Sequence, residues 1–185
     1  MKRIVFCLAL LAAVVLSAGA ARADQKDARL PGLFDQLKAA PNIDAATEIE
    51  AKIWAIWVKS SDPEIDGLMA EGEREMGERH YPQALQAFNR IIEKRPDFAE
   101  GWNRRATLYY LMGEYQKSLG DIDRTLQLEP RHFGAISGMG LVDIKLERME
   151  DAAKAYERYL AINPQNQDAR DTLDMINAVL KRKSI

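Results

Sequence analysis

The chain has 185 residues, with 26 Lys and Arg against 28 Asp and Glu, so its net charge of −2 is close to neutral. This balance disfavours broad nucleic-acid binding, which requires a basic face. An apolar fraction of 47% suits a folded chain of about one domain rather than a disordered one.

The first 23 residues have the three parts of a secretory signal peptide. A basic start at residues 2–3 precedes an apolar core at 4–16 and a small-residue cleavage site at 21–23. We expect cleavage after Ala23 and a periplasmic or secreted protein with no stable membrane insertion. An uncleaved membrane anchor is the alternative, although the apolar run is short for a comfortable span. Cleavage removes three cations and no acid, so the net charge falls from −2 to −5.

The single cysteine, Cys7, lies inside this leader segment. The mature chain is therefore expected to have no thiol. This excludes disulfides, thiolate catalysis and cysteine-based metal sites.

Two helices are predicted in the N-terminal segment 24–64. The first is expected over Leu30–Ala40, and Pro41 ends it because proline cannot continue a helix. The second, over Ile43–Lys59, carries an apolar stripe at three- and four-residue spacing. Its apolar residues are Ile49, Ile53, Trp54, Ile56, Trp57 and Val58. Asp62 is predicted to cap the next helix, with Pro63 in its first position.

A 34-residue period follows, marked by Pro96, Pro130 and Pro164. Such a period predicts stacked helical hairpins, here over residues 65–98, 99–132 and 133–166. Each unit has a small residue on its first helix and another twelve positions later on its second, where two backbones must approach closely. These are Gly72 and Ala84, Ala106 and Ser118, and Gly140 and Ala152, surrounded by the larger Leu68, Phe88, Trp102, Ile122, Ile136 and Tyr156. Residues 167–185 are predicted to form a capping helix for the last unit.

The middle unit resembles the tetratricopeptide repeat (TPR) family. It matches the family's aromatic, small, tyrosine, glycine, small and proline positions through Trp102, Ala106, Tyr109, Gly113, Ser118 and Pro130. The resemblance implies an all-α superhelix, a TPR solenoid of three hairpins with N-terminal helices and a C-terminal cap. The third unit departs from the pattern at Asp143, and the first at Glu71 and Glu75, where the family buries apolar groups. Residues 24–64 are open to interpretation as a degenerate further repeat. The signal makes the chain similar to short exported bacterial TPR proteins.

The resemblance implies a groove along the first helices that holds a protein or peptide. By repeat position, the groove residues are Asp66, Met69, Glu73 and Met76, then Glu100, Asn103, Thr107 and Tyr110, then Gly134, Ser137, Leu141 and Ile144, with Arg104 at the edge. Asn103 both donates and accepts, so it is suited to hold a backbone amide. The apolar and acidic mixture predicts an apolar partner segment with a basic bias. The Lys, Asn and Arg set with which some TPR domains grip a C-terminal carboxylate is absent, because Met69, Glu73, Gly134 and Gly138 stand there.

Several residues allow a structural and a functional interpretation. Trp54 and Trp57 suit either an aromatic recognition site or packing against the first repeat. Glu71 and Glu75 suit either a functional acidic pair or ion pairing and solvent exposure. His80 and His132 fall at a turn and a repeat junction, with no metal-ligand spacing between them.

The sequence shows no phosphate loop or nucleophile elbow, so we expect no enzyme, no cofactor and no metal. The main interpretation is an exported scaffold that binds a protein partner in the cell envelope. The alternative is an accessory subunit of an envelope assembly machine, for cytochrome maturation, secretion or outer-membrane biogenesis, which would also use the N-terminal helices.

Overall fold

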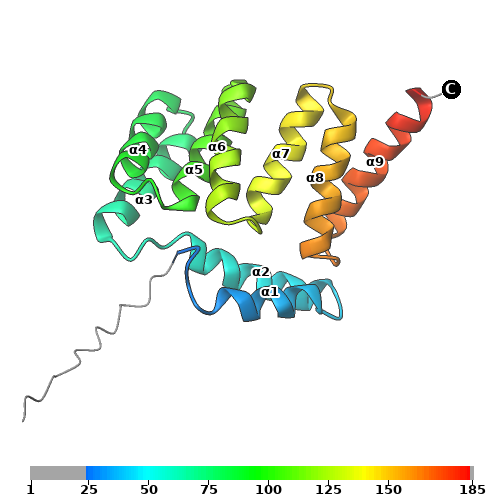
Figure 1. The fold of residues 1–185 in the computed structure, drawn as a ribbon. Helices are drawn as coiled ribbons and strands as arrows, with labels where there is room; N and C mark the ends of the chain where they lie inside the picture. The colour runs from blue at the N-terminus through cyan, green and yellow to red at the C-terminus, as the bar shows by residue number, and fades with distance from the viewer. Residues whose placement is uncertain (1–23, 184–185) are drawn as a thin grey trace, which may run out of the picture.

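The computed structural model describes residues 24–183, and this part of the chain folds into nine α-helices packed largely as consecutive pairs (Figure 1). Their bounds are α1 Leu30–Lys38, α2 Ile43–Trp57, α3 Pro63–Gly77, α4 Tyr81–Lys94, α5 Ala99–Leu111, α6 Tyr115–Leu128, α7 Phe133–Lys145, α8 Met149–Ile162 and α9 Gln167–Lys183. The signal peptide predicted over residues 1–23 lies outside the described residues. Within residues 24–183, no helix combines the length and the apolar character needed to cross a bilayer.

The small residues predicted from the period allow each hairpin to close. A Cβ atom added to Gly72 would lie 2.4 Å from Cε1 of Phe88, and one added to Gly140 would lie 2.6 Å from Cε2 of Tyr156. In the middle hairpin, Ser118 Oγ instead donates a 2.8 Å hydrogen bond to the carbonyl of Ala106. Rings and a hydroxyl of the second helices thus press directly onto the backbone of the first helices.

The turn inside each hairpin has one residue in the left-handed region, again at the 34-residue period. These residues are Arg79 with φ 63°, Gly113 with φ 75° and Glu147 with φ 59°. The next amide closes the turn by bonding back five residues, as Glu114 N does to Tyr109 O at 2.9 Å. Only the middle turn has the glycine that suits this conformation.

The N-terminal pair α1 and α2 does not continue the stack as a further repeat. It lies across one edge of the hairpins, along the lower side of Figure 1. Its apolar face shares a single core with α7, α8 and α9. The buried members of that core include Phe34, Ile53, Trp57, Phe133 and Ile176. The pair therefore covers the edge of the stacked hairpins and shares its apolar core with the third hairpin and α9.

Polar contacts fasten the same segment along the edge. The side chain of Gln25 donates to Asp97 O and accepts from Ala99 N at 3.2 Å. At the other end, Tyr159 donates to Glu50 at 2.8 Å and Gln165 donates to Ala40 O at 3.0 Å. Residues 24–57 thus bridge the junction before α5 to the junction before α9.

The two tryptophans of α2 pack against the third hairpin. One interpretation of the sequence placed them against the first repeat, and the structure does not bear this out. Trp57 stacks on His132 with ring centroids 4.2 Å apart, and Trp54 meets Phe133 edge-on at 5.3 Å. Trp102, expected among the core-filling residues, is only partly buried, and its Nε1 donates to Pro96 O at 3.0 Å. The predicted cap of α3 is confirmed, because Asp62 accepts from Glu64 N at 2.9 Å and Pro63 opens the helix.

Candidate functional site

A pocket of about 200 Å³ lies between α5 and α7 and is closed at its base by α6. Six predicted groove residues line it, which are Asn103, Thr107, Tyr110, Gly134, Ser137 and Leu141. The structure thus brings residues from two neighbouring repeats to one hollow. Ordinary small-molecule sites measure roughly 300–1,000 Å³, so this pocket suits one side chain of a longer ligand.

The pocket is hollow because small residues face it from α7. Gly134 and Gly138 lie one helical turn apart there, and both line the pocket. A Cβ on Gly138 would meet Ile122 at an ordinary 3.6 Å, whereas one on Gly134 would lie 2.6 Å from the Trp54 ring. Gly134 is therefore held by packing with α2, and Gly138 leaves room for a ligand.

The sequence prediction omitted four lining residues, which are Ala106, Ser118, Ile122 and Gly138. Ser118 and Ile122 belong to α6, which the repeat pattern assigns to the interior. The spacing of two glycines four residues apart, at Gly134 and Gly138, is a sequence signal that could have identified the face of α7 that lines the pocket.

The walls of the pocket are mainly apolar. Tyr110 is partly buried, with its ring centroid 5.8 Å from that of Tyr115, and Leu141 lies at the rim with 41% of its surface exposed. Ile122 is 2% exposed and forms part of the base. A ligand side chain entering here would gain apolar contact on several sides, which favours binding by roughly 25 cal/mol for each Å² buried.

Asn103 is 6% exposed and held in place by a buried polar network. Its Nδ2 donates to Glu100 at 3.0 Å, and His132 Nε2 approaches the same carboxylate at 2.9 Å. His132 Nδ1 accepts from Ala135 N at 3.1 Å, so the ring proton belongs on Nε2 and is donated to Glu100. The network joins the first turn of α5 to the cap of α7 and fixes the Asn103 amide toward the pocket.

Arg104 ties the same network to the first repeat and to α2. Its Nε lies 2.7 Å from Glu100 and 3.2 Å from Glu73, and its guanidinium carbon is 5.9 Å from the Trp54 ring. Neither the Arg104 Nε nor the facing Glu100 oxygen makes a directional hydrogen bond, so the contact is one between charges. Arg104 thus neutralises the carboxylates predicted for the groove.

Several other predicted groove residues serve the fold. Met69 is 4% exposed in the core of the first hairpin, because α4 and α5 cover that side of α3. Met76 and Ile144 are half-buried against neighbouring cores. Asp66 accepts from Ser60 N at 2.8 Å and so holds the loop before α3. The predicted groove residues that line the pocket therefore come from the second and third repeats, and those of the first repeat do not line it.

Among residues 24–183, the acidic and histidine side chains discussed next do not line the pocket. Glu75 pairs with Arg74 at 2.6 Å and with His80 at 3.0 Å, and Glu71 is exposed, as the structural interpretation of both acids expects. Burial and the negative charge of the nearby Asp151 raise the pKa of Asp143, and they outweigh Arg148, whose positive charge lowers it. Glu75, Glu78 and His80 bring three ligand atoms within 4.8 Å at an exposed turn, where Arg74 already neutralises Glu75.

Comparisons with known proteins agree with this architecture. The tetratricopeptide repeat family profile matches residues 69–133. A TPR repeat-containing protein of Rhizobium etli is 40% identical over 148 residues, covering 80% of this chain and 72% of the relative. Hsp70-Hsp90 organizing protein 3 of Arabidopsis thaliana is 27% identical over 111 residues, and the match spans only 20% of its length.

Solved TPR domains share the fold. The Sgt2 TPR domain from Aspergillus fumigatus superposes with a TM-score of 0.62 at 22% identity, covering 66% of this chain and 82% of that domain. The first TPR of Spaghetti (RPAP3), bound to the HSP90 peptide SRMEEVD, gives 0.61 at 23% identity, covering 64% and 94%. The 34-residue period, the packed hairpins and the bacterial relative lead to one conclusion: the chain belongs to the tetratricopeptide repeat family.

Proposed function

We propose that this protein is an exported, non-catalytic scaffold that binds a peptide segment of a protein partner in the cell envelope. The observation that carries the proposal is the pocket between α5 and α7, which is apolar, open at Leu141 and backed by the fixed amide of Asn103. The export part of the proposal is supported by the signal-like pattern of residues 1–23.

The segment inserts one apolar side chain between α5 and α7. Asn103 uses one amide hydrogen on Glu100, and its Oδ1 and second N–H remain for the backbone of the ligand. Because this amide is already fixed, binding loses little side-chain entropy at that contact. Hydrogen bonds there would set the register of the peptide.

The ligand preference is for apolar rather than basic segments. The basic bias depended on Asp66, Glu73 and Glu100, which already contact Ser60, Arg104 and His132. An acidic chaperone tail, such as the HSP90 peptide in the RPAP3 structure, is also disfavoured. Met69 is buried and Glu73 is acidic where the carboxylate-gripping TPR domains carry polar or basic groups.

The test is photo-crosslinking in cells from position 141. Leu141 is exposed at the rim, whereas Asn103 is buried and bonded, so a crosslinker at position 103 would disturb the site. We expect capture of a defined partner peptide that contains an aliphatic or aromatic residue. The variant Gly138→Leu should abolish the capture by filling the pocket.

Gly138→Ala is the matched control, because its Cβ meets only Ile122 at 3.6 Å. It should retain most of the capture. If Gly138→Leu is folded by circular dichroism and captures the same peptide as the parent chain, the pocket is not the binding site.

A further inference from the structure

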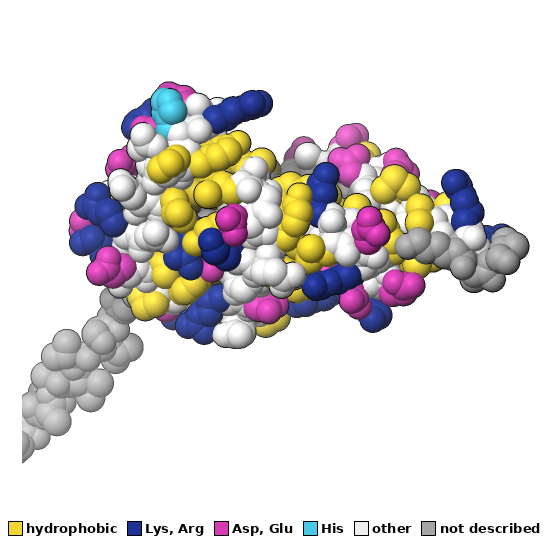
Figure 2. Space-filling view, turned by 90° about the horizontal axis from the view of Figure 1, so that it is seen from above, with side chains coloured by type: hydrophobic (Ala, Val, Ile, Leu, Met, Phe, Trp, Pro, Cys, Tyr) yellow, Lys and Arg dark blue, Asp and Glu magenta, His cyan; other side chains and the backbone are white. Residues whose placement is uncertain are grey.

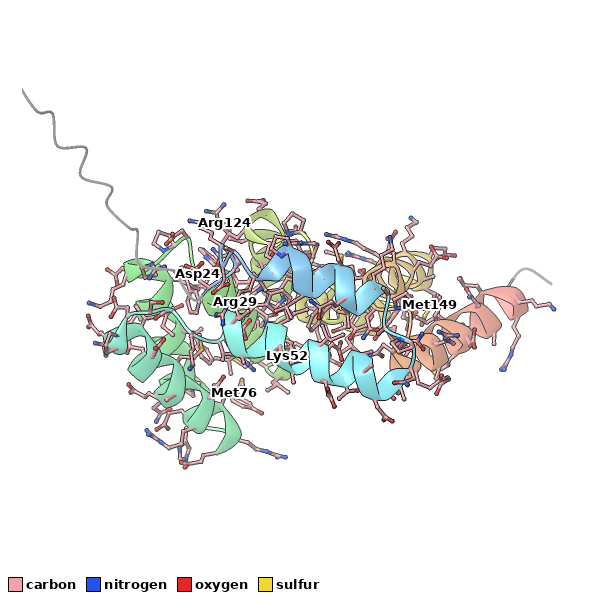
Figure 3. The ribbon with its side chains drawn as sticks, turned by 90° about the horizontal axis from the view of Figure 1, so that it is seen from below. Asp24, Arg29, Lys52, Met76, Arg124 and Met149 are labelled. Carbon is pink, nitrogen blue, oxygen red and sulfur yellow. The ribbon has the colours of Figure 1, made fainter. Side chains whose placement is uncertain are left out.

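A second groove lies on the opposite side of the N-terminal pair, between α1 and α2. Its volume is about 780 Å³, and Figure 3 shows this side with Arg29 and Lys52 beside the seam. Leu33 and Ile56 form its apolar floor, and Gly32 and Ala55 line it without a large side chain. A Cβ added to Gly32 would meet nothing within 4 Å, so the groove is open there.

Cations surround this groove, and no acidic residue lines it. Lys52 and Lys59 are exposed, and within residues 24–183 neither forms an ion pair within 4.0 Å. Arg29 pairs with Asp27 at 2.7 Å but keeps 66% of its side chain exposed. In contrast, cations and acids are interspersed on the opposite edge of the molecule (Figure 2). A basic rim on a chain with a net charge of −2 is a local feature that selects an acidic ligand.

The dimensions suit a helix. Lys52 lies on α2, and Lys59 lies in the segment that follows Trp57, the last residue of α2, so the two cations line the groove from successive parts of the chain. Small residues between two antiparallel helices let a third helix approach closely, and an amphipathic helix binds such a groove through residues at i, i+3, i+4 and i+7.

We propose that this groove docks an amphipathic helix of a partner protein, with Asp and Glu flanking the apolar face of that helix. A lipid surface fits the geometry less well. Membrane-bound helices project their apolar residues into the bilayer, whereas Ile56 is 4% exposed and Leu33 is only partly exposed at the floor of a hollow. The groove is also preformed, because the other faces of α1 and α2 are locked into the core with α7 and α8.

This site is independent of the pocket between α5 and α7. The two share no lining residue. A chain with both surfaces could hold a peptide of one protein while docking on another, as the envelope assembly alternative requires. Gly138→Leu should therefore leave binding at α1 and α2 unchanged.

The experiment uses the full chain with a photo-crosslinker at Gln36, an exposed residue on the rim. The variants are the double charge reversal Lys52→Glu with Lys59→Glu, and a control reversal of Lys145 and Lys154, which are exposed on α7 and α8. Deleting α1 and α2 would expose the shared core, so point variants are used instead. Circular dichroism checks that each variant is folded.

We expect the captured peptide, mapped by mass spectrometry, to carry apolar residues at helical spacing flanked by Asp or Glu. The reversal at positions 52 and 59 should lower the yield about tenfold, since two exposed ion pairs become repulsive, and the control reversal should not. Vesicles of phosphatidylcholine with about 30% phosphatidylglycerol present an anionic lipid surface. They should not bind the chain.

Four outcomes would overturn the proposal. They are capture of a neutral or basic segment, a yield unchanged by the reversal at 52 and 59, a yield no higher than from a crosslinker at position 154, and vesicle binding that the reversal abolishes. The last outcome would assign the groove to a lipid surface.

Discussion

Replacing Trp57 by alanine tests whether α1 and α2 belong to the core of the repeats. Trp57 is 1% exposed, and its ring centroid lies 4.2 Å from His132 and 4.8 Å from Phe133. Removing a buried tryptophan costs about 3–5 kcal/mol. The Nε1 of Trp57 is buried without an acceptor, so its removal returns about 1 kcal/mol. The free energy of unfolding should therefore fall by about 3 kcal/mol.

The assay is urea unfolding followed by far-ultraviolet circular dichroism. A loss of about 3 kcal/mol lowers the melting temperature of a chain this size by about 6–12 °C. The m value should stay constant, because the native state still buries the same segments. Trp57→Phe keeps the stacked ring and removes the unpaired N–H, so its effect should stay within about 1 kcal/mol.

Trp102→Ala is the matched control. Trp102 is partly buried, with its Nε1 bonded to Pro96 O at 3.0 Å and the Arg105 guanidinium 5.0 Å from its ring. Its removal should cost about 1 kcal/mol. If Trp57→Ala costs no more than Trp102→Ala, the N-terminal pair is not part of the cooperative core and the reasoning fails.

Three further changes test the turns and the charges. Glu147→Gly should stabilise the protein by about 0.5 kcal/mol, because glycine relieves the left-handed φ of 59°; an equal gain from Glu147→Ala would refute this. Burial raises the pKa of Asp143, so its ionised form weakens the fold and the protein gains stability as pH falls through that pKa. Asp143→Asn should therefore raise the melting temperature at pH 7, with an advantage that shrinks toward pH 4; a constant difference would contradict it. Burial also raises the pKa of Asp97, but hydrogen bonds from Arg95 and Lys26 outweigh it and lower the value to about 2. The ionised form of Asp97 thus stabilises the fold above pH 4 and loses this effect as the pH falls through about 2, so Asp97→Asn should be destabilising at pH 7 by an amount that shrinks steadily from pH 4 to pH 2.

Repeat position alone identified part of the pocket lining. Asn103, Thr107 and Tyr110 are spaced at three and four residues, so any helix places them on one face, and the pattern identified them without the structure. The burial of Met69 and Glu100 on the corresponding faces could not be read in the same way. Whether a groove position is open depends on which helix covers it, and α4, α5 and His132 cover these two.

The sequence by itself determined the hairpins and their period. The contacts that form a hairpin join residues close in the chain, such as Ala106 with Ser118. Each 34-residue unit therefore contains the residues that fold it into a hairpin. The tertiary structure alone decided where α1 and α2 lie. Their partners are distant in the chain, with Trp57 on His132 and Glu50 bonded to Tyr159. An amphipathic stripe predicts that one face of a helix is buried, but it does not predict which surface covers that face. The apolar edge of the third hairpin and the cap of α7 provided that surface, and so left the basic groove facing outward.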